Sequence, residues 1–459
     1  MKASTTWQGG PGVDKSVPAG TMTIQNVAIP CLDPTLLFDV GVAGGIIAQI
    51  DSVADRDSHR YSLELWPGYV ESHAHLGLPA NFDDSLDDPR LIALQYLFHG
   101  VTHVVDMFGF PLVKTLWELG RMQSPVPYPE LAHCGYAATS MRDSDGLTGH
   151  GVEFPAPVFM LGIQEDLDTI LRANRERGAT FLKVMFTNGT EQPRSKKKFS
   201  RLSPNVLEGV ARVTAEHGIP CVLDCNTRDE VFQAYSYGFR IFAHSVRDVE
   251  LSSDDWRALH GARFVSTLSG LRPMIMQREE FLHEYSRFGF QETQDVENME
   301  FVSTIHEPFG IQFDCQESRT AALGNMRQNS LAALTRNALL VGTDCGNTGA
   351  FHGYSLLSEL DLLAGDDIDV PHRKDELRHA ATVSGWRFFN ELSGRLVTAK
   401  PIAIGCTATF NLLAATGNDR ALSALPEATV INGAVIDRQA VLQEIRALRS
   451  SETKGKVKL

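Results

Sequence analysis

Between residues 65 and 342 the chain alternates short, continuously apolar runs with longer segments in which apolar residues recur at helical spacing. Strands that are apolar on both faces are typical of a parallel sheet covered by helices. Helical stretches lie at 166–177, 204–217, 228–237 and 330–336. Eight strands in alternation with helices predict an α/β fold of the (β/α)8 TIM-barrel type. The eight runs are Leu65–Glu71, Val101–Asp106, Ala132–Ala138, Thr180–Phe186, Cys221–Cys225, Arg240–Ala243, Arg263–Thr267 and Leu339–Gly342.

The two ends of the chain have a different pattern. Residues 1–64 contain short strands and turns, and residues 395–459 return to short strands with a hairpin turn predicted at Asn432-Gly433. We expect the two ends to pair into one discontinuous β-sandwich domain, which leaves residues 65–394 as the barrel. Within the barrel, the segment 273–325 is too long for a simple connection. We interpret it as a helical insertion and a candidate lid over the barrel mouth.

The composition limits the kinds of molecule that we expect the protein to bind. The net charge of −14 argues against nucleic-acid binding, which needs a basic surface. No apolar stretch approaches the length that crosses a bilayer, and no apolar signal segment begins the chain. The seven cysteines have no metal-finger spacing, which favours a reducing compartment. We therefore expect a cytoplasmic enzyme that acts on a small molecule, without a nucleic-acid or membrane partner.

Residues that can bind a metal ion lie at the ends of several predicted strands. His73 and His75 are two positions apart, and alternate side chains of a strand face the same way. Lys183, His244 and Asp344 each close an apolar run much further along the chain. Because the carboxyl ends of barrel strands meet at one mouth, these residues predict a catalytic metal site. The plainer alternatives are a hydrogen-bonded or core histidine and a salt-bridged lysine.

The order and spacing of several motifs resemble those of the amidohydrolase superfamily, most of all its imidazolonepropionase-like and prolidase-like branch. The resemblance runs nearly from end to end of the chain. It implies a barrel with a small β-sandwich, a metal-dependent hydrolase of carbon–nitrogen bonds in small molecules, and a homo-oligomer. The motifs are Pro67-Gly68 to His75, residues 100–106, 147–151 and 178–184, His244, residues 341–346, and Phe351-His352-Gly353.

The resemblance also implies a set of metal ligands. His73 and His75 would hold the more buried ion together with Asp344. Lys183 would bridge two ions as a carbamate, and His244 would bind the second ion. The expected metal is Zn²⁺, as one or two ions, with Mn²⁺ or Mg²⁺ as alternatives.

Further roles follow for residues around the predicted metal. Asp344 would accept the proton of activated water and later deliver it to the leaving group. His150 would stabilise the oxyanion, and it would contact the substrate together with Asn226 and His352. Asp106, which closes the second strand, is expected to support the structure.

The chain departs from the family pattern at the fifth strand, where the family has a histidine and this chain has Asp224. Three interpretations remain open. Asp224 still binds the metal, with a preference for Mn²⁺ or Mg²⁺; the second metal is lost; or hydrolysis itself is lost. The first is favoured because the other ligand-type residues are present. The departure also leaves an alternative function, a metal-dependent lyase, isomerase or decarboxylase on the same scaffold.

Overall fold

The computed structural model describes most of the chain. The described residues are 21–56, 61–76, 88–109, 111–141, 158–161, 164–187, 200–276, 280, 283–286, 289–294, 316–347, 349–365, 372–395, 400–415, 422 and 424–452.

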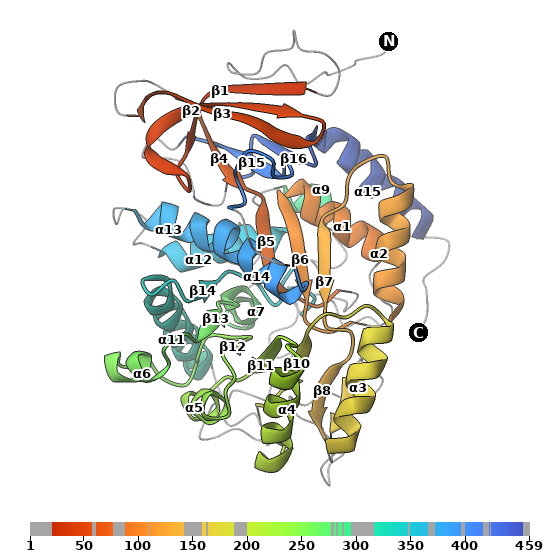
Figure 1. Ribbon diagram of the computed structural model, residues 1–459, viewed down its shortest axis with the longest axis vertical. Coiled ribbons are helices and arrows are strands. Elements are labelled where there is room, and N and C mark those ends of the chain that lie inside the picture. Colours follow the sequence, from red (N-terminus) through yellow and green to blue (C-terminus); the bar gives the residue numbers. More distant parts are fainter. Residues whose placement is uncertain are drawn as a thin grey trace.

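Strands from both ends of the chain form one seven-stranded sheet, at the top of Figure 1. Strands β4 and β15 join the two ends, because they pair antiparallel with Asn411 opposite Trp66. The predicted hairpin turn is confirmed: β16 and β17 pair on either side of Asn432 and Gly433, which both have positive φ. In sheet order the strands are β17 (Ala434–Val435), β16 (Ala428–Ile431), β15 (Phe410–Ala414), β4 (Leu63–Pro67), β1 (Thr21–Ile29), β2 (Asp33–Ala43) and β3 (Ile46–Asp55).

The remaining strands pair in parallel and form two further sheets. One has the order β5 (Tyr69–Ala74), β6 (Val101–Asp106) and β7 (Glu130–His133). The other has the order β14 (Leu339–Leu340), β13 (Arg263–Val265), β12 (Ile241–Phe242), β11 (Cys221–Asp224), β10 (Leu182–Met185), β8 (Ala137–Ser140) and β9 (Val158–Leu161).

Backbone hydrogen bonds connect these two parallel sheets at both junctions. Ser72 N donates to Val341 O at 3.2 Å, and Thr180 N donates to His133 O at 3.3 Å. The parallel strands therefore form one curled, laterally connected array.

Side chains of the parallel strands alternate between two apolar cores. This alternation is what strands with two apolar faces predict. On and beside β10, Phe181 and Met185 face the inner core, whereas Leu182 and Val184 face the outer core under the helices. Phe388 from α14 also enters the inner core. The helices of this part are α1 (Pro89–Phe98), α2 (Pro111–Gln123), α3 (Gln164–Glu176), α4 (Pro204–Glu216), α5 (Arg228–Ser236), α6 (Ser253–Ala258), α7 (Leu268–Leu271), α11 (Gln316–Leu334), α12 (Tyr354–Ala364), α13 (Arg373–His379) and α14 (Gly385–Leu392).

Shorter elements complete the described chain. A 3₁₀ turn spans Arg272–Met274, α9 spans Phe290–Thr293, and a π-helical segment, Ala380–Ser384, links α13 to α14. Helix α15 (Arg438–Glu452) follows the last strand and lies near α1 (Figure 1).

Two predicted strands are each divided by a glycine. The run 65–71 is split between β4 and β5 at Gly68, where a side chain would begin 2.1 Å from Thr102 Oγ1. The run 132–138 is split between β7 and β8 at Gly135, which has a φ of 68°. Each break moves the chain from one sheet to another, so the single strands predicted there are wrong.

Other boundaries also differ from the sequence prediction. Helix α11 begins at Gln316 and absorbs the last part of the interpreted insertion 273–325, most of which lies outside the described residues. Strand β9 was not predicted, and it adds an edge beside β8. Among the described helices, none is both long and apolar enough to span a membrane.

The buried histidine His103 on β6 gives a testable pH dependence. Its ring lies 4.8 Å from the Phe389 ring, and burial lowers the pKa of His103 to about 4. Below about pH 6.5 the unfolded chain binds a proton that the folded chain resists, so this group lowers stability as the pH falls from 6.5 towards 4. His103→Asn should therefore gain about 2 kcal/mol relative to the parent protein between pH 7.5 and 4.5. Urea unfolding at both pH values measures this, and an unchanged difference in unfolding free energy would contradict it.

Candidate metal centre

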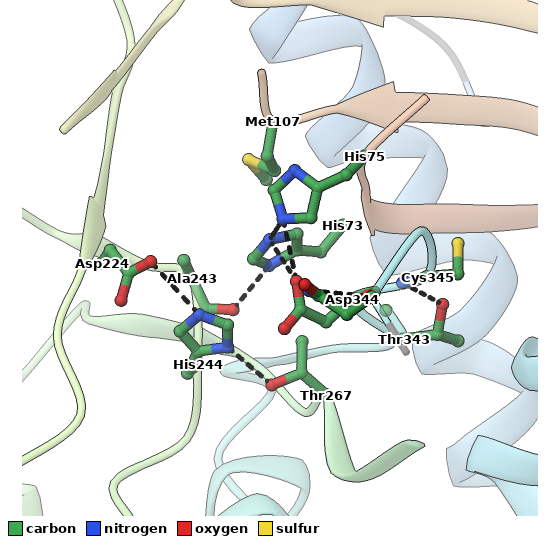
Figure 2. A network of polar contacts seen from close by, with 12 residues as sticks. His73, His75, Met107, Asp224, Ala243, His244, Thr267, Thr343, Asp344 and Cys345 are labelled. Carbon is green, nitrogen blue, oxygen red and sulfur yellow. Dashed lines mark hydrogen bonds and ion pairs between the residues drawn. The ribbon is translucent and has the colours of Figure 1, made fainter. Parts of the chain in front are cut away.

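Three side chains with metal-binding atoms converge at the carboxyl ends of β5 and β14 (Figure 2). The Nε2 atoms of His73 and His75 are 3.2 Å apart, and Asp344 Oδ1 lies 3.2 Å from the first and 2.9 Å from the second. All the candidate ligand atoms lie within 4.8 Å of one another. Among the described residues this is the group that has the geometry of a metal site, and the structure brings together three of the residues that the sequence singled out.

Backbone pairing explains why the three side chains meet. Asp344 N donates to His73 O at 2.9 Å, and His75 N donates to Cys345 O at 2.8 Å. Gly346 makes this close approach possible, because a side chain there would begin 2.2 Å from His75 O. Asp344 itself has a φ of 60°, a left-handed conformation that aspartate tolerates better than most residues. The chain thus accepts local backbone strain at the position that carries the carboxylate.

The charge states of the three side chains suit a cation. Burial lowers the pKa of His73 well below its usual value, and it also lowers the pKa of His75. For Asp344, burial works to raise the pKa, but the surrounding imidazoles hold it well below its ordinary range. His73 Nδ1 lies 2.9 Å from Ala243 O, which assigns the proton to Nδ1 and leaves the lone pair of Nε2 to face the cluster. Neutral imidazoles and an ionised carboxylate are the forms that bind metal ions.

A second group of polar side chains lies next to the first. Asp224 Oδ2 is 3.6 Å from Lys183 Nζ and 3.4 Å from His244 Nε2. The His244 ring is 4.9 Å from the His73 ring, and His244 Nδ1 is 2.8 Å from Thr267 Oγ1. The residues expected to bind a second ion therefore contact one another, and all three are buried.

The remaining predicted residues are placed as follows. Asn226 is buried, and neither its amide nitrogen nor its oxygen has a hydrogen-bond partner among the described residues. His352 is also buried, with Nδ1 3.0 Å from the Tyr96 hydroxyl, and burial lowers its pKa to about 3. Asp106 accepts a hydrogen bond from Leu76 N at 3.2 Å. His150 lies outside the described residues.

Sequence reasoning missed Glu71, a buried carboxylate behind the ligands. It accepts hydrogen bonds from His73 N at 3.0 Å and from Thr343 N at 2.9 Å, and a third from the Thr343 hydroxyl at 2.7 Å. Burial raises the pKa of Glu71 to about 8. An acidic residue inside an apolar strand, two positions before His73, was the signal that could have revealed this role.

Glu359 was missed in the same way. It accepts hydrogen bonds from Leu268 N at 2.9 Å and Ser269 N at 2.7 Å, at the start of α7. Thr267, the residue just before α7, has a φ of 54° and contacts His244. Glu359 thus fixes the backbone that positions Thr267, but nothing local in the sequence links the two.

The sequence matches no family model and no curated protein, but the structure resembles many solved ones. Bottromycin amidohydrolase is 20% identical, with a TM-score of 0.62 over 95% of this chain and 91% of its own. A Xaa-Pro dipeptidase with bound methionine is 14% identical, with a TM-score of 0.60 over 87% of this chain and 95% of its own. The ochratoxinase of A. niger is 16% identical, with a TM-score of 0.59 over 87% and 90%.

The chain has the fold of amidohydrolases. The structural comparison thus agrees with the resemblance that the sequence motifs carry. It covers most of both chains in each pair, so both the sheet made from the two chain ends and the parallel array belong to the shared fold.

We predict that Glu71→Ala destabilises the protein by about 1–3 kcal/mol, because it leaves the buried N–H groups of His73 and Thr343 without their acceptor. Chemical denaturation at neutral pH measures the change. Glu216→Ala on the exposed surface of α4 is the matched control and should stay within about 0.5 kcal/mol of the parent. Equal effects of the two substitutions would show that Glu71 does not hold the ligand-bearing segments together.

Proposed function

We propose that the protein is a metal-dependent hydrolase that cleaves a carbon–nitrogen bond, such as an amide, a cyclic amide or a peptide-like bond, in a small molecule. The observation that carries this proposal is the convergence of His73, His75 and Asp344 at the ends of parallel strands. A fold shared with amidohydrolases and a dipeptidase supports it. We also propose that the curled parallel array is the (β/α)8 barrel, with residues 1–64 and 395–459 as its companion domain.

The residues fit a divalent metal ion. Two imidazole nitrogens and one carboxylate oxygen are a donor set that catalytic Zn²⁺ sites use, with further positions open to water or substrate. Mn²⁺ and Mg²⁺ remain alternatives, since carboxylate oxygens also suit them. When bound, such an ion activates water and polarises the carbonyl group of the substrate.

Proton transfer, metal binding and substrate binding are assigned to different residues of the chain. His73 is fully buried, whereas the Asp344 side chain is 19% exposed, so the carboxylate is the part of the cluster that water and substrate can reach. Asp344 accepts the proton of the attacking water and delivers it to the leaving nitrogen. His73 and His75 hold the ion, and Glu71 fixes the backbone that carries them. Asn226 and His352 are the proposed substrate contacts, and His150 the proposed oxyanion donor.

Asp344→Asn should fold like the parent, because asparagine also tolerates a left-handed backbone, but lose turnover by about 10²- to 10⁴-fold. The assay uses N-acyl amino acids, dipeptides and cyclic imides in ¹⁸O-labelled water. Hydrolysis places one solvent oxygen in the carboxylate product. A variant as active as the parent would refute the role of Asp344, and products without solvent oxygen would favour a lyase or isomerase reaction.

Zn²⁺ should stabilise the metal-free parent by about 3 kcal/mol at a concentration a hundred times its dissociation constant. His75→Ala should lose most of this gain because it lacks one ligand. Thermal and urea unfolding with and without added metal measure the effect. His260→Ala, at an exposed position, is the matched control and should respond like the parent. If His75→Ala is stabilised as strongly as the parent, the ion binds elsewhere.

A further inference from the structure

The side chain of Lys183 is fully buried and faces a carboxylate. Its Nζ lies 3.6 Å from Asp224 Oδ2 and makes no hydrogen bond to the described residues. Strand register explains the contact. Asp224 stands opposite Met185 on the neighbouring strand, and Lys183 is two residues earlier on the same face. The long lysine side chain therefore runs along β10 towards the carboxyl end and reaches Asp224.

The imidazole that would face a second ion is turned to the same carboxylate. His244 Nδ1 contacts Thr267 Oγ1 at 2.8 Å, which leaves Nε2 as the atom free to bind a metal. That Nε2 lies 3.4 Å from Asp224 Oδ2 (Figure 2). The same carboxylate oxygen lies 3.6 Å from Lys183 Nζ. One carboxylate oxygen thus lies between an amine and an imidazole where a second ion would have its ligands.

We propose that Lys183 stays an uncarboxylated ammonium paired with Asp224, and that this ion pair replaces the second metal ion, so that the site holds one. The inference rests on the proposed function. It concerns Lys183 and Asp224, for which the sequence allowed more than one role.

The change in charge on Lys183 explains why its ion pair with Asp224 and its conversion to a carbamate are alternatives. To form a carbamate, the neutral Nζ adds to carbon dioxide: an N–C bond forms, one C=O bond becomes an anionic C–O, and Nζ releases a proton. The positive charge of Lys183 would become a negative charge beside the buried Asp224 carboxylate. Without a second divalent ion to compensate them, two like charges in a buried site repel each other strongly, whereas an ammonium compensates the carboxylate with no further ion. A neutral imidazole at position 224 would bring no such conflict.

Metal content and carbamate content test the proposal directly. The parent protein is reconstituted with Zn²⁺ or Mn²⁺ in ¹³C-bicarbonate, ions per chain are counted by mass spectrometry, and the carbamate carbon is sought by ¹³C NMR. We expect one ion per chain and no carbamate signal. Asp224→His should bind two ions and show the signal. Adding Lys183→Met to that variant is the matched control, and it should remove both the second ion and the carbamate signal.

Two results would overturn the proposal. One is a parent protein with two ions and a carbamate signal, which would leave the proposed hydrolase standing. The other is a folded Asp224→His variant that still binds one ion and shows no carbamate, because Asp224 would then not be what excludes the second ion. If that variant does not fold, the measurements on the parent decide alone. A parent that binds no divalent ion would overturn the proposed function as well.

Discussion

The backbone link between the end of β5 and the loop after β14 is the interaction on which the candidate site depends. Two hydrogen bonds, Asp344 N to His73 O and His75 N to Cys345 O, join segments about 270 residues apart in sequence. Glu71 adds a third connection through Thr343. The same contacts connect the first parallel strand to the last, so the curvature of the array and the convergence of the ligands have one cause.

Burying so many polar groups costs folding free energy, and nearby hydrogen bonds offset this cost. Glu71 and Glu359 are each satisfied by backbone N–H groups, and His73 by the Ala243 carbonyl. Left-handed backbone at Asp344 and Thr267 adds strain at the positions that carry or contact candidate ligands. Strain and burial concentrated at one end of the strands are typical of a functional site, where stability is given up for a fixed geometry.

Local patterns in the sequence predicted those features that local physics determines. Apolar runs on both faces indicated parallel strands, and the Asn432-Gly433 pair indicated a hairpin because both residues adopt positive φ. The breaks at Gly68 and Gly135 were missed, because each depends on contacts with another part of the chain: Thr102 in one case and Asn174 in the other. For the site, period-two spacing indicated His73 and His75, but the pairing of Lys183 with Asp224 depends on strand register, which the sequence alone does not set.

Anomalous diffraction from crystals grown with Zn²⁺ shows whether His73, His75 and Asp344 bind one metal ion together. We expect a strong anomalous peak about 2.0–2.2 Å from His73 Nε2, His75 Nε2 and an Asp344 carboxylate oxygen. The absence of a peak at this position, or a peak that none of these three side chains contacts, would contradict this expectation.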